Sequence, residues 1–177
     1  MFPILTLAQV PPMTTPAPQE IIQNNPVRSL PGKLDKVPVF NSNSPEQVLQ
    51  EGILLSTFPA KGKTNPQAHL NYPLKGYFDI FAHHVAKAPT PENLRTLYLG
   101  IILHNPTNKT VTVNITQSAS YLSQPDAPFI ELPPQVDDPD GKVYAGPGGR
   151  VMGDILRGKH QDIFPQQLVI PPSSSKM

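Results

Sequence analysis

Four of the five histidines are the side chains in this sequence best suited to catalysis or metal binding. His83 and His84 are adjacent in YFDIFAHHVA, His104 follows the apolar run LYLGIIL, and His69 lies in a polar loop. A catalytic zinc site needs at least three nitrogen or oxygen ligands around an open position. Because side chains alternate along a strand, His83 and His84 would point to opposite faces. We therefore expect one buried, hydrogen-bonded histidine and one surface histidine, although His83, His84 and His104 are the histidines that a metal would recruit.

The acidic segment 135–142 carries a weaker signal for cation binding. Asp137, Asp138 and Asp140 precede Gly141, an arrangement that resembles a calcium loop but lacks its downstream glutamate. Asp-Gly is by itself a strong turn signal. We interpret the segment as a solvated acidic turn, with Asp138 and Asp140 as the ligands of any weak surface cation site.

The Gly-rich segment 144–158 could bind an anion through its backbone amides. It has neither the Gly-Lys-Ser/Thr of a phosphate loop nor the three spaced glycines of a dinucleotide fingerprint. It therefore predicts a structural loop that Arg150 or Arg157 anchors. Together with His69, these two arginines are the candidate binding residues.

The motif search yields no catalytic residue. The chain has no Gly-x-Ser-x-Gly elbow, and its acidic residues lie mostly in loops and form no pair suited to glycoside hydrolysis. It also has no cysteine, which excludes disulfides, thiolate metal sites and cysteine nucleophiles. We expect neither a catalytic site nor a cofactor.

Composition excludes further classes of partner. The net charge is +1 with 15% charged residues, so there is no electrostatic footprint for nucleic acid. No apolar run reaches the roughly 18 residues that a membrane-spanning helix needs. The 24 prolines favour short strands separated by rigid loops.

Periodicity predicts the elements that would position these residues. The strongest signal is residues 94–118, where two alternating apolar runs flank the polar turn HNPTNK and predict a β-hairpin. Further strands are expected at 35–40, as a short edge strand, and at 53–58, 77–86, 129–132 and 167–170. Ser44-Pro45 followed by Gln47 predicts the start of a helix of about two turns. The expected fold is all-β: an antiparallel β-sandwich with one short helix and an extended Pro-rich N-terminal arm.

The domain organisation follows from the N-terminal composition. Residues 1–10 (MFPILTLAQV) have the small-x-small site and short apolar run of the end of a secretory signal, but no basic region. Residues 11–32 form the Pro-rich arm. Residues 33–177 form the β-sandwich domain, which we expect to be incomplete at its C-terminus.

Several segments resemble a family of cyanobacterial proteins of unknown function. The resemblance is carried by VFNSNSPE at 39–46, GILLSTF at 52–58, FDIFAHH at 78–84, LYLGIILHNP at 97–106, SYLSQPDAPFIELP at 120–133 and YAGPGGRVMGDILRG at 144–158. Members of the family are longer and begin with a secretory signal. The resemblance implies a truncated chain in the periplasm, the outer envelope or the medium, and it implies no activity.

Two functions are consistent with these observations. The first is a non-enzymatic envelope or secreted module that binds an unknown macromolecular partner through its sheet face, Pro-rich arm or an open strand edge. An open edge would also make the chain prone to self-association. The second is a polysaccharide hydrolase or lyase whose cleft is lined by His83, His84, His104 and Asp79. A cleft that joins these residues would favour the enzyme, and scattered histidines would favour the binding module.

Overall fold

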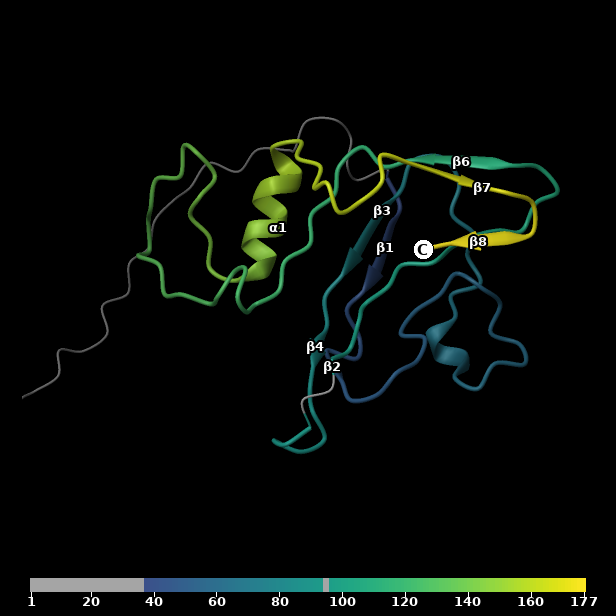
Figure 1. The fold of residues 1–177 in the computed structure, drawn as a ribbon, viewed down its shortest axis with the longest axis horizontal. Helices are drawn as coiled ribbons and strands as arrows, with labels where there is room; N and C mark the ends of the chain where they lie inside the picture. Colours follow the sequence, from purple (N-terminus) through teal and green to yellow (C-terminus); the bar gives the residue numbers. More distant parts are fainter. Residues whose placement is uncertain (1–36, 94–95) are drawn as a thin grey trace, which may run out of the picture. The chain divides into compact units, whose positions relative to one another are not determined.

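The computed structural model describes residues 37–93 and 96–177, which contain mainly short β-strands (Figure 1). The predicted signal remnant at 1–10 and the predicted arm at 11–32 lie outside the described residues. Within these residues, eight strands accompany a single α-helix, which confirms the all-β class. The strands form four two-stranded sheets, so the predicted sandwich is not confirmed.

Two of these sheets are parallel and are built from the same two chain segments. β1 (Val39–Ser42) pairs with β3 (Asp79–Ala82), and β2 (Gln47–Val48) pairs with β4 (Val85–Ala86). We refer to the four strands as the parallel ribbon. Parallel neighbours need a long connection, which here contains the 3-10 helix η2 (Pro66–Ala68). The predicted strand at 77–86 is thus confirmed in large part, as β3 and β4 on either side of His83 and His84.

The other two sheets are antiparallel and correct the predicted hairpin. β5 (Leu103–Asn105) pairs with β8 (Ser174–Lys176), and β6 (Val111–Asn114) pairs with β7 (Gln167–Ile170). We refer to these strands as the antiparallel ribbon. The strand at 167–170 is confirmed, but the hairpin is wrong because β5 and β6 pair with distant segments and not with each other. Residues 96–102 are not a strand, and Tyr98 is 93% exposed.

A buried asparagine links the loop after β5 to the β7–β8 turn. Asn105 is 3% exposed, and its Nδ2 donates to the carbonyl oxygens of Lys109, Ile170 and Pro171 at 2.8–3.0 Å. Its Oδ1 accepts hydrogen bonds from the amide and hydroxyl of Thr107. One side chain thereby satisfies backbone groups of both the 105–109 loop and the β7–β8 turn. These contacts are consistent with β5 and β6 finding their partners in the later segment.

The Gly-rich segment is a helix and not the predicted loop. α1 (Pro147–Leu156) begins after Gly146 with Pro147 in its first turn, and Gly158 follows its end with a φ of 75°. Proline at the start and a left-handed glycine just past the end are typical helix boundaries. Three glycines within ten residues weaken the intrinsic helix propensity, so contacts with other segments must supply much of the helix's stability.

Three shorter predictions are also wrong. Residues 44–46 form a bend that leads into β2, so the segment does not begin a helix. Residues 53–58 form only one isolated bridge, Ser56 with His69, and Ile53 is 62% exposed. Residues 129–132 are not a strand, and Phe129 is largely exposed. In the two predicted strands, a few apolar residues satisfied a local pattern without an adjacent surface on which to pack.

Few apolar side chains of the described residues are fully covered. The buried ones are Ala68, Ala127 and Ile170, whereas Val39, Val85, Val111 and Val169 on the ribbons remain exposed. In the antiparallel ribbon, Val113 and Leu168 are opposite each other, as are Val111 and Ile170, so these four residues share one face. Two-stranded ribbons are only marginally stable alone in water. Their exposed edges and apolar side chains are therefore the main surface feature of the fold.

Candidate functional site

The structure places His83 and His84 where they join the two segments of the parallel ribbon. Nδ1 of His84 is 2.8 Å from the carbonyl oxygen of Pro45, so Nδ1 must donate this bond. In the neutral ring, Nε2 then accepts a bond from the Ser42 hydroxyl at 2.9 Å. Nδ1 of His83 contacts Oδ1 of Asn43 at 3.2 Å. Both histidines are half-buried and hydrogen-bonded, so the prediction that one would be a surface histidine is wrong.

His104 and His69 form similar contacts in other parts of the fold. Nδ1 of His104 lies 3.0 Å from the hydroxyl of Ser175 across the β5–β8 pair, and its ring packs edge-on against Phe58. Nδ1 of His69 lies 2.6 Å from the Ser56 hydroxyl, which also accepts the amide of Phe58. His69, His84 and His104 each pair with a serine of another segment, and this repetition indicates a structural use of the pair.

The histidines do not assemble a catalytic cleft with Asp79. Among the described residues, no three His, Asp or Glu side chains are close enough to hold one metal ion. Asp79 is exposed on β3, and its backbone amide pairs with Pro38. The two open pockets described in residues 37–93 and 96–177 are lined by other residues. The arrangement on which the hydrolase interpretation depended is therefore not formed by these side chains.

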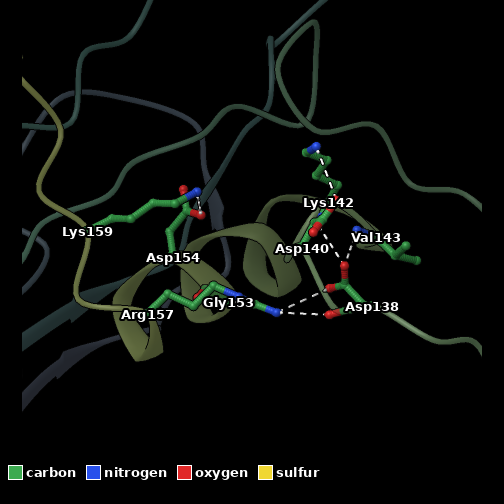
Figure 2. Close-up of polar contacts among 8 residues, drawn as sticks. All are labelled: Asp138, Asp140, Lys142, Val143, Gly153, Asp154, Arg157 and Lys159. Carbon is green, nitrogen blue, oxygen red and sulfur yellow. Dashed lines mark hydrogen bonds and ion pairs between the residues drawn. The ribbon is translucent and has the colours of Figure 1, made fainter.

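The acidic turn uses its central carboxylate for internal contacts (Figure 2). Oδ1 of Asp138 accepts the amides of Lys142 and Val143 at 2.7 and 3.2 Å, and Oδ2 lies 3.6 Å from the Arg157 guanidinium. Partial desolvation raises the pKa of Asp138, but these two amides and the charge of Arg157 outweigh it and leave the pKa below its usual value. Asp140 pairs with Lys142 at 3.4 Å. The turn thus anchors the end of α1.

Three charged residues of α1 and its C-cap lie on one side of the helix and contact other segments. Arg150, Asp154 and Arg157 have i, i+4, i+7 spacing, which places them on one helix face. The Arg150 guanidinium lies 4.0 Å from the ring centre of Tyr121 and 5.1 Å from that of Tyr144, and it donates to the carbonyl oxygen of Asp126. Arg157 donates to the carbonyl oxygen of Asp138. The arginines thus anchor this segment even though it is helical.

Asp154 is the buried charge of this helix face. Its side chain is 5% exposed; Oδ1 lies 2.6 Å from Nζ of Lys159, and Oδ2 accepts the Tyr121 hydroxyl at 2.6 Å. Hydrogen bonds from Lys159 and Tyr121 lower the pKa of Asp154 despite desolvation, and the charges of Lys159 and Arg150 lower it further. The carboxylate is therefore ionised at neutral pH and connects α1 to two other segments. In contrast, Met152 and Leu156 on the helix remain exposed.

An open pocket of about 520 Å³ lies beside α1 and is the candidate binding site of the described residues. The residues that supply its polar lining are Ser120, Tyr121, Asp126, Arg150, Gln161 and Asp162. Backbone pairing of 118–120 with 159–161 forms one wall, in which Gln161 Oε1 accepts the amide of Ser120 at 2.8 Å. Nε2 of His160, another residue of the lining, is buried without a hydrogen-bond partner among the described residues.

The sequence identified only part of this site. Arg150 was a predicted binding residue and lines the pocket, whereas Arg157 contacts the acidic turn and His69 contacts Ser56. The contributions of Tyr121 and Asp162 were not predicted, because their segments carry no motif and are far from Arg150 in sequence. The one available signal was the i, i+4, i+7 spacing of Arg150, Asp154 and Arg157, which becomes visible once the segment is recognised as a helix.

Comparison with known proteins identifies a family and no activity. Residues 25–177 match the family model described as Protein of unknown function (DUF3370). No curated protein and no solved structure is significantly similar to the chain. The match agrees with the resemblance to a family of unknown function, while the cyanobacterial and envelope assignments stay predictions.

Proposed function

Because the chain belongs to this family of unknown function (DUF3370), we propose its function from the geometry alone. It is a non-enzymatic structural or binding module that contacts a macromolecular partner through its open strand edges. The observation that carries this proposal is that every strand of the described residues pairs with one neighbour only. Unpaired backbone N–H and C=O groups along such an edge can pair with a strand of another molecule.

The antiparallel ribbon has the best-defined edge. The amide of Ile115 donates to Gln166 at 2.9 Å, and alternate residues of an antiparallel strand bond to the same neighbour. The amides of Val111 and Val113 therefore face β7, and that of Thr112 faces away from it. Exposed Val111 adds apolar surface to the edge contact. A strand added beside β6 would gain hydrogen bonds and cover part of this side chain.

We place this binding outside the cytoplasm, in the periplasm, in the outer envelope or after secretion. The support is the signal-like composition of residues 1–10. None of the described helices has the length and apolar character needed to cross a membrane.

A proline at the open edge tests the proposal. Thr112→Pro removes the outward amide and leaves the inward hydrogen bonds of β6 in place, and proline is tolerated on edge strands. We expect the full chain to bind an envelope fraction of its source cells, with amide-exchange protection of 111–114, and Thr112→Pro to bind at least about tenfold more weakly. Thr112→Ala keeps the amide and should bind like the unchanged chain.

Two outcomes would overturn this proposal. One is equal binding by Thr112→Pro and Thr112→Ala, which would show that the β6 edge is not used. The other is turnover of envelope polysaccharide that is lost in His84→Ala or His104→Ala, which would establish the enzyme. Circular dichroism of each variant separates a loss of binding from a loss of folding.

A further inference from the structure

We propose that the pocket beside α1 binds a neutral saccharide. The pocket is a shallow depression of about 520 Å³ that is largely open to solvent, so a sugar could bind there with one face exposed. It is formed by segments outside the parallel and antiparallel ribbons, so it is a second binding site, distinct from the strand edges. The proposal rests on the chemistry of the unoccupied hydrogen-bonding groups in its lining.

The lining offers both hydrogen-bond donors and hydrogen-bond acceptors. The Arg150 guanidinium has five N–H groups and donates one hydrogen bond, to the carbonyl oxygen of Asp126. The Asp126 carboxylate accepts the amide of Leu122 through Oδ2, which leaves Oδ1 available. The Asp162 side chain has no hydrogen bond or ion pair with any described residue. A hydroxyl group both donates and accepts, so neighbouring hydroxyls of one sugar ring satisfy a guanidinium and a carboxylate together.

The lining carries two carboxylates and one guanidinium, so its charges disfavour an anion. Two carboxylates, Asp126 and Asp162, share the pocket with one guanidinium, Arg150. An anion such as phosphate would meet both carboxylates at short range, and a polyamine would meet the guanidinium. A polyhydroxylated neutral molecule avoids both conflicts, and like-charge repulsion thereby provides discrimination.

The walls of the pocket are held in place before a ligand arrives. Tyr121 donates to Asp154 at 2.6 Å while its ring lies 4.0 Å from the Arg150 guanidinium, which orients both side chains. Gln161 pairs with the backbone of Ser120. The exposed Ile163 side chain at the rim offers an aliphatic surface to the C–H face of a sugar. Preorganised polar groups reduce the entropy cost of binding.

A nuclear magnetic resonance titration of the full, isotope-labelled chain tests the proposal. The probes are maltose, cellobiose and N,N′-diacetylchitobiose, with inorganic phosphate and spermidine as charged comparators. We expect at least one disaccharide to produce saturable shifts of the Ser120, Gln161 and Ile163 amide signals. Phosphate and spermidine should leave these signals unchanged.

Two charge-matched variants locate the ligand. Asp162→Asn removes the unoccupied carboxylate and should weaken disaccharide binding by at least about tenfold. Asp137→Asn makes the same chemical change on an exposed residue outside the pocket and should leave binding unchanged. Because Arg150 also anchors α1, its replacement is not used. If the amide signals of residues outside the pocket coincide with those of the unchanged chain, both variants are folded.

The proposal is overturned if none of the three disaccharides gives saturable shifts at these signals. It is also overturned if phosphate or spermidine binds there instead, or if Asp162→Asn and Asp137→Asn bind equally well. Thr112→Pro should bind the disaccharide like the unchanged chain, because β6 lies outside the pocket. Failure at the strand edge and failure at the pocket are therefore distinguishable.

Discussion

The antiparallel ribbon is stabilised by a neutral side chain, whereas the α1 segment is stabilised by charged side chains. In the ribbon, the neutral side chain of Asn105 satisfies backbone groups of two turns. At α1, the charged residues Arg150, Asp154 and Arg157 contact the segments around the helix. A neutral hydrogen-bonding group does not respond to pH, whereas carboxylates and their ion pairs respond to pH and to salt. A change of pH or salt, like a mutation, should therefore destabilise one region without the other.

The difference also indicates how each region contributes to function. Under the proposed function, the ribbon combines the uncharged contacts of Asn105 with an open edge, which suits a lasting contact with a large partner. The α1 segment combines ion pairs with a pocket, and the groups that hold Asp154 in place also hold the pocket wall through Tyr121. Disturbing the ion pairs should consequently affect the pocket more than the strand edge.

Removing the Asn105 side chain should have the largest effect on stability. Asn105→Ala leaves three carbonyl groups and the Thr107 amide without their side-chain partner, and we expect the free energy of unfolding to fall by about 3 kcal/mol. Urea denaturation followed by circular dichroism measures the change. Asn108→Ala in the same loop is the matched control, because Asn108 is exposed, and should lie within about 0.5 kcal/mol of the unchanged chain. Equal effects of the two substitutions would contradict the role given to Asn105.

Acid should loosen α1 before it affects the Asn105 contacts. The pKa values of Asp138 and Asp154 are lowered in the folded chain, so their stabilisation is fully present above the unfolded value, near pH 4. It is lost as the pH falls through the lower folded values. Hydrogen exchange from about pH 6 to about pH 3 should show earlier opening at 147–156 than at 103–114. Simultaneous opening of both regions would contradict the comparison.

Neutralising the buried carboxylate should reproduce this loosening at neutral pH. Asp154→Asn keeps an acceptor for Tyr121 but removes the ion pair with Lys159, and we expect a loss of about 1–2 kcal/mol. Asp137→Asn, an exposed residue, is the control and should have almost no effect. Thermal melts with local exchange measurements at α1 distinguish a local change from a global one.

Substitutions at two glycines with similar backbone conformations should isolate the contribution of the Arg157–Asp138 ion pair. Gly141 and Gly62 have φ values of 68° and 76°, so alanine is strained at both, by about 1 kcal/mol. At Gly141 an added Cβ would also lie 2.4 Å from Cζ of Arg157, whereas nothing lies within 4 Å at Gly62. We expect Gly141→Ala to lower the melting temperature slightly more than Gly62→Ala, because Arg157 must leave Asp138. High salt should reduce the difference, and a difference that salt leaves unchanged would argue against the ion pair.

The strands were predictable where a local pattern coincided with a real partner. Alternation identified 167–170 and most of 77–86, because these segments have neighbours that use the pattern. The same reasoning failed at 53–58 and 129–132, where apolar residues have no adjacent sheet. The helix was missed because its three glycines lower the helix propensity of the segment, and this loss is offset by charged contacts that only the structure reveals. Pro147 and Gly158 nevertheless mark the boundaries of the helix.

The sequence by itself determined the all-β class and the single residues suited to binding, such as Arg150. These depend on proline content, side-chain period and residue chemistry, which are local properties. Only the tertiary structure decided that β5 and β6 pair with β8 and β7, and that Arg150 lies with Tyr121 and Asp162 in one pocket. Such choices depend on contacts between residues far apart in the chain, which local periodicity does not encode.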